Sequence, residues 1–221
     1  MLNKNIGALT IGQSPRPDLV APLIQRLPVG YQVIQAGALD GLSTKSLPPI
    51  SSATYPLSTR LLDGTLVMVE EAFLAPKLQE ALDLLEAQAV LATLLLCAGT
   101  FAELSGTRPL FKPFTVCCDV LQTGGMQTIG LIAPIKEQEV PIRQRWQSAG
   151  FQTVVWTADL TRQDKQFARQ LAIQIETNKL ECIVLDYVGH PTWVVQQLQK
   201  FCSVPVIDLG QLAVAILSGT L

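Results

Sequence analysis

Strands alternate with helices along almost the whole chain, and this order constrains the fold more than any other feature of the sequence. Short apolar runs are each followed by a segment in which apolar residues recur at helical spacing. The first run covers residues 6–11, and the segment after it carries one apolar helix face formed by Leu19, Val20, Leu23, Ile24 and Leu27. Strands that alternate with helices are typical of parallel sheets built from β-α-β units. The sequence therefore predicts the α/β fold class.

The expected elements can be placed along each half of the chain. In the first half, strands are expected over 6–11, 31–36 and 90–96, and helices over 19–27 and 75–88. Between them we expect an irregular loop over 40–58 and a hairpin over 60–70 that turns at Asp63-Gly64, a strong turn signal. In the second half, strands are expected over 128–133, 151–156, 182–185 and 204–207, and helices over 137–149, 164–178, 192–201 and 209–218. Gly150 should occupy the C′ position of the helix before it.

The two halves also resemble each other in sequence. The matches at an offset of 119 residues, with one inserted residue before the last, are Pro15 with Pro134, Pro22 with Pro141, Gln25-Arg26 with Gln144-Arg145, and Gly30-Tyr31-Gln32 with Gly150-Phe151-Gln152. They favour a duplication, and the alternative is that β-α-β units share a composition. We expect two similar Rossmann-like lobes with parallel sheets, the first over 1–106 and completed by 206–221, the second over 107–205.

Composition excludes several classes of protein. Apolar residues make up 48% of the chain and charged residues 15%, which is the opposite of a disordered chain. The net charge of −2 predicts no binding to nucleic acid or to a membrane surface. No apolar run approaches the ~20 residues of a membrane span, and the first residues lead into a strand pattern rather than a signal peptide. We therefore expect a cytoplasmic protein.

Cysteine and histidine content bears on metals and disulfides. The chain has five cysteines and one histidine, and no CxxC pair occurs. An odd number of cysteines in a chain of this size argues against a disulfide framework, and a single histidine argues against a His-based zinc site. The sequence predicts neither a metal nor a cofactor.

A second alignment concerns the ends of two predicted strands, one in each half. Residues 94–100 align with residues 184–190, and each segment is a buried strand that ends in a polar turn containing glycine. In open α/β sheets, ligands bind outside the carboxyl ends of the strands. If the two halves face each other, Cys97 and Tyr187 lie on opposite walls of one cleft, where a small ligand would bind.

Cys97 is the candidate thiol in this arrangement. It ends a buried strand just before Gly99 and Thr100, and the backbone N–H groups of such a turn can bind an anion and stabilise a thiolate. The alternative is a small apolar core residue, which most free cysteines are. We expect the other four cysteines to be structural: Cys117 and Cys118, which in a strand would point to opposite faces, and Cys182 and Cys202, which lie among apolar neighbours.

Polar residues after the first strand form a candidate anion site. Ser14 and the free N–H groups of the helix start can bind an anion, and Arg16 can hold a carboxylate through two hydrogen bonds. An ordinary helix cap with a solvated arginine explains these residues equally well. Gly12, Gln13 and Arg60 complete the expected ligand-binding set of the first half, and an exposed ion pair is the alternative for Arg60.

The second polar turn carries Asp186, Tyr187, Gly189 and His190. Asp186 follows four apolar residues, so it is expected to be partly buried and to need a partner. His190 can act as a general acid or base near neutral pH, or it can simply begin the helix that follows. We expect Asp186 and Gly189 to contact the ligand and Tyr187 or His190 to take part in catalysis.

Several of these segments resemble motifs of the AroM family. The resemblance rests on Leu9-Thr10-Ile11-Gly12-Gln13-Ser14-Pro15-Arg16-Pro17-Asp18, on Tyr55-Pro56-Leu57 with Thr59-Arg60-Leu61, on Leu95-Leu96-Cys97, and on Val184-Leu185-Asp186 with Gly189. It runs from the first strand to the last helix, and its first motif is the most specific. It implies a fold more than a reaction.

The expected architecture is also similar to the aspartate/glutamate racemase superfamily. That resemblance implies two Rossmann-like halves in a pseudo-two-fold arrangement, a ligand carboxylate in the cleft, and one cysteine from each half. Cys97 matches the first cysteine, whereas Tyr187 stands at the second position. Tyrosine has an unperturbed pKa of ~10 and is a poor substitute for a thiol, so racemisation is not expected.

Two hypotheses follow. In the first, the chain is a cofactor-independent isomerase- or lyase-like enzyme for a small carboxylic acid, with Cys97 as nucleophile or acid/base. In the second, it is a binding or regulatory protein that keeps the cleft without the second catalytic cysteine. The expected partner in both is a small carboxylate or other small anion, and a homodimer is the candidate assembly.

Overall fold

The computed structural model describes residues 4–51, 56–158 and 165–221, and these form two compact units. The first unit comprises Met1–Thr115 and Ala213–Leu221, and the second comprises Val116–Leu212. The chain passes from one unit to the other within α3 (Pro113–Thr123) and returns within α7 (Leu209–Gly219). Tyr55 of the AroM-like motif lies outside the described residues.

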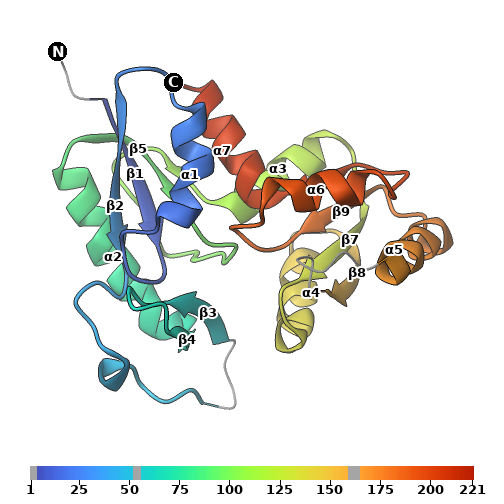
Figure 1. Ribbon diagram of the computed structural model, residues 1–221, viewed down its shortest axis with the longest axis horizontal. Coiled ribbons are helices and arrows are strands. Elements are labelled where there is room, and N and C mark those ends of the chain that lie inside the picture. Colours follow the sequence, from blue (N-terminus) through green and yellow to red (C-terminus); the bar gives the residue numbers. More distant parts are fainter. Residues whose placement is uncertain (1–3, 52–55, 159–164) are drawn as a thin grey trace. The chain divides into compact units, whose positions relative to one another are not determined.

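The first unit contains a sheet of four parallel strands in the order β2-β1-β5-β6. These strands are β1 (Lys4–Thr10), β2 (Tyr31–Gly37), β5 (Val90–Leu95) and β6 (Leu110–Phe111). The chain moves from β1 to β2 through α1 (Pro17–Arg26) and back past β1 to β5 through α2 (Glu71–Ala87). Because such crossovers are right-handed, the two helices cover opposite faces of the sheet (Figure 1).

The second unit repeats this strand order. Its parallel sheet runs β10-β9-β7-β8, formed by β7 (Thr128–Ala133), β8 (Gln152–Thr157), β9 (Cys182–Leu185) and β10 (Val206–Asp208). The helices of this unit are α4 (Glu139–Ser148), α5 (Lys165–Asn178) and α6 (Thr192–Gln199), and short 3-10 turns occur at η1 (Thr44–Ser46) in the first unit and η2 (Lys136–Gln138) in the second. In both sheets the first strand lies between the second and the third. The predicted α/β class, with one parallel sheet in each of two lobes, is confirmed.

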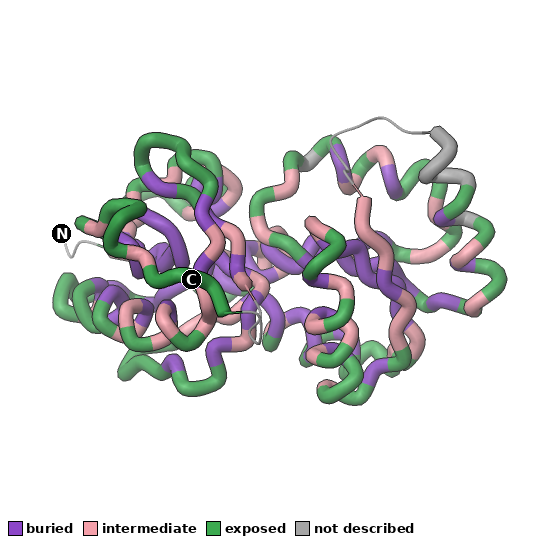
Figure 2. The backbone as a smooth tube through the Cα atoms, turned by 90° about the horizontal axis from the view of Figure 1, so that it is seen from below, coloured by how far each residue is buried: buried purple, intermediate pink, exposed green. Residues whose placement is uncertain are grey.

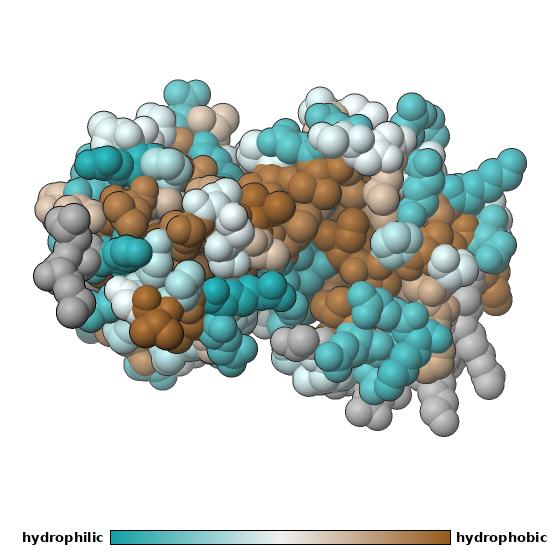
Figure 3. Space-filling view, turned by 90° about the horizontal axis from the view of Figure 1, so that it is seen from above, coloured by the Kyte–Doolittle hydropathy of each residue, from teal (hydrophilic) through white to brown (hydrophobic). Residues whose placement is uncertain are grey.

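The central strands are buried on both faces, as their near-continuous apolar sequences predict. Every residue of β9 is buried, and so are the last five residues of β1 (Figure 2). The core of the first unit joins Leu9 and Leu95 of the sheet to Leu74, Leu78 and Leu82 of α2. The core of the second unit joins its sheet to α5 and α6 through Ile183, Leu185, Leu171, Ile175 and Val194. On the face shown in Figure 3, hydrophobic residues gather into patches that hydrophilic residues border.

The end of α4 shows how local sequence sets a helix boundary. Gly150 has a φ of 96°, and it donates its N–H to Gln147 O at 2.9 Å while Phe151 donates to Trp146 O at 3.1 Å. This is the Schellman arrangement, in which a glycine at C′ adopts the left-handed conformation without steric cost. The rings of Trp146 and Phe151 pack edge to face with centroids 5.4 Å apart, which closes the motif with an apolar contact. The predicted role of Gly150 is confirmed.

The predicted hairpin forms, but its first strand lies earlier than expected. β3 (Pro56–Arg60) pairs antiparallel with β4 (Leu66–Glu70), and the turn passes through Asp63-Gly64. Asp63 Oδ1 accepts the Thr65 N–H at 2.8 Å, and Gly64 has a φ of 86°. Residues 56–58 were expected in the irregular loop. They form a strand because this pairing buries Leu57 in the core of the first unit.

Two further expectations differ from the structure. Cys117 and Cys118 lie in α3 rather than in a strand, and helical geometry allows both neighbouring side chains to be buried. Residues 206–212 belong to the second unit rather than the first, because β10 pairs with β9 through the whole of its length. Residues 107–115 belong to the first unit rather than the second, because β6 pairs with β5. Among the described residues, no helix is both long and apolar enough to cross a membrane.

Candidate functional site

Cys97 lies just beyond the carboxyl end of β5 in the first unit. Its side chain is buried, and the Gly99 N–H donates a hydrogen bond to Cys97 Sγ at 3.3 Å. The turn continues through the half-buried Thr100 to the buried Phe101, which has a positive φ of 39°. A positive φ is costly for a residue with a bulky side chain and persists only where the surroundings enforce it. The turn therefore holds a backbone donor against the sulfur, as the sequence predicts.

Lys112 brings a positive charge to the same end of the sheet, and the sequence analysis does not single it out. β6 pairs with β5 so that Phe111 lies opposite Leu94, and Lys112 and Cys97 both follow at the carboxyl end of this strand pair. Lys112 Nζ donates to Phe101 O at 2.8 Å, and burial lowers the pKa of the ammonium group. A lysine that directly follows the apolar pair Leu110-Phe111 is the signal that sequence reasoning could have used.

The donors of Ser14 are engaged within the first unit. The Ser14 N–H and hydroxyl both donate to the Asp40 carboxylate at 2.6 Å, and the Gly37 N–H donates to it at 2.8 Å. An anion is therefore bound where the sequence predicts one, but it is the chain's own Asp40. A Cβ at position 37 would lie 2.4 Å from Gly12 O, so only glycine allows the two loops to approach this closely.

Gln13 is a structural link between two loops of the first unit. Its Nε2 donates to Leu39 O at 2.9 Å and Leu42 O at 2.7 Å, and its Oε1 accepts the Leu62 N–H at 2.7 Å. The side chain is buried, and these bonds use both amide hydrogens. Gly12 lies beside the hairpin, where an added Cβ would be 2.4 Å from Thr59 Oγ1. Both residues hold the loop after β1 in place.

The two arginines expected near the ligand have partners in the fold. Arg16 binds Asp18 through Nε at 2.9 Å and a terminal nitrogen at 2.6 Å, while its backbone N–H donates to Gln35 Oε1. Asp18 is more than half exposed, so this pair is open to competition from another carboxylate. Arg60 is exposed and donates to Gly64 O at 3.3 Å, across the hairpin turn.

Asp186 is enclosed at the carboxyl end of β9 in the second unit. Its side chain is fully buried, and a terminal nitrogen of Arg145 lies 2.6 Å from Oδ1 and also contacts Oδ2. The Trp146 Nε1–H donates to Oδ2 at 3.1 Å. The expected partner of this buried carboxylate is therefore present, and a ligand has to displace Arg145 to reach it.

Tyr187 and His190 lie together in the turn after Asp186. Their rings pack edge to face with centroids 5.1 Å apart, and Gly189 between them has a φ of 108°. Tyr187 is 39% exposed, whereas His190 is half-buried and burial lowers its pKa to about 4. At neutral pH the imidazole is therefore uncharged.

Asp208 and Gln211 are polar residues of the second unit that the sequence analysis did not select. Asp208 ends β10, and its Oδ1 accepts the Gln211 N–H at 2.9 Å at the start of α7. Its side chain is buried, and burial raises its pKa to about 6. Asp208 follows Val206-Ile207 just as Asp186 follows Val184-Leu185, so the same sequence signal would have found it.

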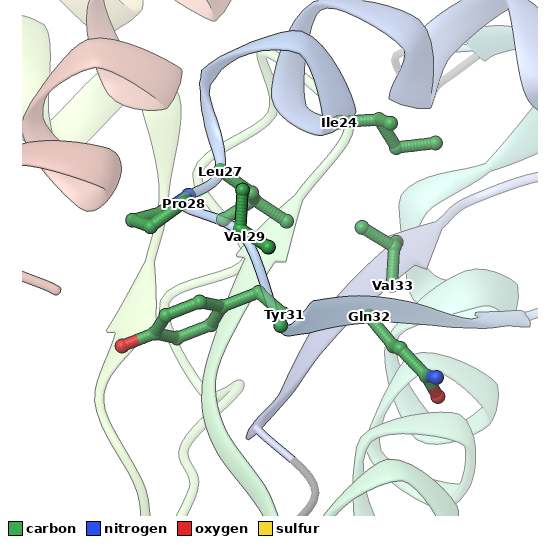
Figure 4. Close-up of a pocket in the computed structure, with 8 residues that line it drawn as sticks. Ile24, Leu27, Pro28, Val29, Tyr31, Gln32 and Val33 are labelled. Atoms are coloured by element: carbon green, nitrogen blue, oxygen red, sulfur yellow. The ribbon is translucent and has the colours of Figure 1, made fainter.

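Two pockets lie outside these groups of residues. A groove of about 440 Å³ at the amino end of β2 is lined mainly by apolar side chains such as Ile24, Leu27 and Val29 (Figure 4). A smaller pocket of about 290 Å³ in the second unit has Lys136, Glu139 and Thr157 among its lining residues. Across the described ranges, no group of three or more His, Cys, Asp or Glu side chains is placed to hold a metal ion.

Solved structures of several enzymes and enzyme homologues share this fold at low sequence identity. Arylmalonate decarboxylase has a TM-score of 0.64 and 14% identity, with 97% of this chain and 92% of that chain covered. An aspartate racemase homologue from Pyrococcus horikoshii has a TM-score of 0.60 and 12% identity, with 98% of each chain covered. The maleate isomerase Iso from Pseudomonas putida has a TM-score of 0.59 and 11% identity, with 98% of this chain and 92% of that chain covered.

Sequence comparison identifies the family. A search of curated proteins gives no significant match. Residues 6–221, which include every candidate site residue described above, match the family described as AroM protein. The chain therefore belongs to the AroM family.

Proposed function

We propose that this AroM-family chain is a cofactor-independent enzyme that acts on a small carboxylic acid and uses Cys97 as its catalytic thiol. The observation that carries the proposal is the hydrogen bond from the Gly99 N–H to Cys97 Sγ at the carboxyl end of β5. Backbone N–H groups directed at a sulfur favour the thiolate, which is the reactive form of cysteine. The strand ends of an open α/β sheet are also where ligands bind.

The other cysteines lie in surroundings that disfavour a thiolate. Burial raises the pKa of Cys118 and Cys182 to about 12 and that of Cys202 to about 11, and it raises the pKa of Cys117 further still. At neutral pH these four thiols are protonated almost completely. Cys97 is thus the best candidate for a reactive thiol in this chain.

Lys112 and the turn that follows Cys97 supply the features needed to hold a carboxylate. Lys112 is half-buried and its pKa is lowered by burial, so an incoming anion would restore a favourable environment for its charge. Thr100 can add a hydroxyl donor. Arg16 contributes if the ligand competes with Asp18, because an exposed ion pair of this kind is worth only about 0–1 kcal/mol.

The second acid/base is proposed to be Tyr187 or His190. For an acid with a saturated C–H next to its carboxylate, deprotonation by the Cys97 thiolate gives a thiol and an enolate, and a second group must return a proton to that carbon. For an unsaturated acid such as maleate, the thiolate would instead add to the double bond and the second group would protonate the neighbouring carbon, and reversal of both steps after rotation would release the isomer and the thiolate. His190 is uncharged at neutral pH, so it can donate only as a neutral imidazole, whereas Tyr187 is exposed and carries a hydroxyl. Since tyrosine stands where a second cysteine would be needed, we expect no racemisation of amino acids.

The fold neighbours suggest which reactions to test first. They include an arylmalonate decarboxylase and a maleate isomerase. Wild type should be incubated in D₂O with phenylmalonate, maleate, aspartate and glutamate, and the products followed by NMR. We expect turnover of a non-amino acid that falls at least ~100-fold in Cys97→Ser. Cys202→Ser is the matched control and should keep its activity. Deuterium exchange with both enantiomers of aspartate, retained in Cys97→Ser, would contradict the proposal.

The second candidate function is non-catalytic binding or regulation. It is favoured by one observation, namely that the Ser14 donors are already occupied by Asp40 and Arg16 is paired with Asp18. Alkylation with iodoacetamide between pH 6 and pH 10, mapped by mass spectrometry, separates the two functions. Cys97 should react faster than the other four thiols if the chain is an enzyme, and an inert Cys97 would favour the binding protein.

A further inference from the structure

Three buried polar atoms without a hydrogen-bond partner gather at the carboxyl ends of β9 and β10. Within the described part of the chain, they are Asp208 Oδ2, Gln211 Nε2 and His190 Nε2. Buried polar atoms are almost always paired, because an unpaired group loses its bonds to water without replacement. A group of three at one edge of one sheet is therefore a candidate place for another molecule to bind.

Asp208 is the central residue of this group. Asp208 is only 5% exposed, and its two carboxylate oxygens have different surroundings. Oδ1 caps α7 by accepting the Gln211 N–H at 2.9 Å, so the carboxyl group is held in a fixed orientation. Burial without a compensating cation raises its pKa to about 6, which leaves it mainly ionised at pH 7.5 and able to accept hydrogen bonds.

The turn after β9 lies over this residue. The register of the two strands places Asp208 opposite Leu185, the last residue of β9. A Cβ added to Gly210 would lie 3.2 Å from Val188 Cγ1, so the turn that carries Tyr187 and His190 packs on the first turn of α7. Tyr187 and Gly189 are exposed, which leaves this turn open to solvent.

The side chains of Asp208 at the end of β10 and Gln211 in α7 offer complementary hydrogen bonds. The ionised Asp208 Oδ2 needs a donor, and Gln211 Nε2 carries N–H groups that need an acceptor. Burial of a charged ligand group would cost more desolvation free energy than burial of an uncharged amide. We propose that Asp208 and Gln211 form a binding pair for a carboxamide or ureido group, with the ligand N–H donating to Asp208 Oδ2 and the ligand C=O accepting from Gln211 Nε2.

This inference deepens the proposed function, since it names an amide-bearing carboxylic acid as the class of ligand. The inference rests on the proposed function only for the statement that the ligand carries a carboxylate. Its test measures binding and does not depend on Cys97, so the failure of one idea can be distinguished from the failure of the other.

The test compares three probes of similar length by isothermal titration at pH 7.5. They share one carboxylate and differ at the other end, which is an amide in succinamate, a carboxylate in succinate and an ammonium in 4-aminobutanoate. We expect succinamate to bind wild type at least ~10-fold more tightly than the other two, because a site that hydrogen-bonds a group discriminates strongly against analogues that lack it.

Variants identify the residues responsible. Asp208→Asn keeps the shape and a capping oxygen but cannot satisfy the cap and the ligand N–H at once, and Gln211→Leu removes the donor. Each should weaken succinamate binding ~10-fold or more. The matched control is Gln122→Leu, which removes an exposed glutamine of the same unit and should change nothing. Circular dichroism and thermal melting verify that each variant is folded.

Four results would overturn the proposal. Equal affinity for succinamate and succinate, or no binding of succinamate at millimolar concentration, would show that the pair is solvated and has no amide site. Succinamate binding that survives in both Asp208→Asn and Gln211→Leu would place the amide elsewhere. Tighter binding of 4-aminobutanoate that is lost in Asp208→Asn would show that the site takes an ammonium group instead. Loss of turnover in Cys97→Ser with the succinamate preference intact would leave this inference standing.

Discussion

The carboxyl ends of the two sheets use their polar residues differently, although their strands run in the same order. In the first unit, Asp40 accepts three hydrogen bonds from Ser14 and Gly37, and Gln13 has donors and acceptor all engaged. In the second unit, Asp186 is equally well paired, but Asp208 and Gln211 next to it keep buried atoms without partners among the described residues. The first edge is thus mostly closed by its own side chains, and the second retains unused hydrogen-bonding capacity.

This difference separates residues that hold the fold from residues available to a ligand. Ser14, Gln13 and Asp186 are as polar as Asp208 and as easily noticed in the sequence. Their side chains, however, already form hydrogen bonds within the protein. Around Cys97, the Gly99 N–H is bonded to the sulfur, and the Lys112 ammonium donates one hydrogen bond to Phe101 O and carries two further N–H groups that a ligand could accept. The useful criterion for a site is therefore unsatisfied bonding capacity rather than polarity.

The largest expected effect tests whether Asp186 is structural. Arg145→Met leaves a fully buried carboxylate without its cation, and removal of one partner from such a pair typically costs about 3–5 kcal/mol in the free energy of unfolding. Urea denaturation measures this loss. The control is Arg143→Met on the same helix, which should cost much less. Equal losses in the two variants would mean that Asp186 does not depend on Arg145.

The next effect tests whether burial of the ionised Asp208 carboxylate lowers the free energy of unfolding. Its pKa rises from 3.8 in the unfolded chain to about 6 in the fold, so the folded state binds the proton more tightly. The contribution of this group to the free energy of unfolding is fully present below about pH 3.8 and is lost as the pH rises through about 6. Asp208→Asn should therefore be more stable than wild type at pH 8, by on the order of 3 kcal/mol.

The pH dependence gives this prediction its control. Denaturation of both proteins at several pH values should show an advantage of Asp208→Asn that is nearly constant between pH 8 and pH 7 and then shrinks as the pH falls through about 6 toward 3.8. A difference that is constant over the whole of this range would mean that the carboxyl group titrates normally and that its second oxygen is solvated.

A smaller effect compares a carboxylate in the loop after β2 of the first unit with a carboxylate at the start of α4 in the second unit. Asp40→Ala removes an exposed carboxylate that binds Ser14 and Gly37, and we expect a loss of about 1–2 kcal/mol in the free energy of unfolding. Glu139→Ala in the second unit removes contacts to Thr157 and Lys136 only, both involving exposed or half-buried groups, and should cost less than ~1 kcal/mol. Thermal melting of the two variants side by side shows which one loses more stability. A larger loss in Glu139→Ala would contradict the conclusion that the polar groups at the carboxyl end of the first sheet are mostly paired with one another.

The smallest effect concerns the pair that a ligand is expected to displace. Asp18→Asn breaks an exposed ion pair and should change the free energy of unfolding by less than ~1 kcal/mol. The same substitution frees the Arg16 guanidinium, so binding of succinate should become tighter, which titration calorimetry detects. Weaker binding in Asp18→Asn would mean that Asp18 holds the Arg16 guanidinium in place for the ligand rather than competing with it.

Local sequence was sufficient to predict most of the fold. The apolar runs that became β1, β5, β7 and β9 and the helical spacing of α1, α2 and α4 reflect periodicities that each segment carries on its own. Gly150 ends α4 and Asp63-Gly64 turns the hairpin for the same reason, since both depend on the conformational freedom of a few neighbouring residues. Position 97 at a strand end, followed by a glycine turn, was likewise readable from the sequence.

Only the tertiary structure decided which polar residues have partners. Asp40 reaches Ser14 across 26 positions and Arg145 reaches Asp186 across 41, and no local pattern predicts such contacts. The pairing of β10 with β9 in turn brings Asp208 beside the turn that carries His190. Periodicity acts within one element, whereas hydrogen bonding and burial depend on which elements meet, so the sequence alone could nominate polar residues but could not show which of them the fold leaves unsatisfied.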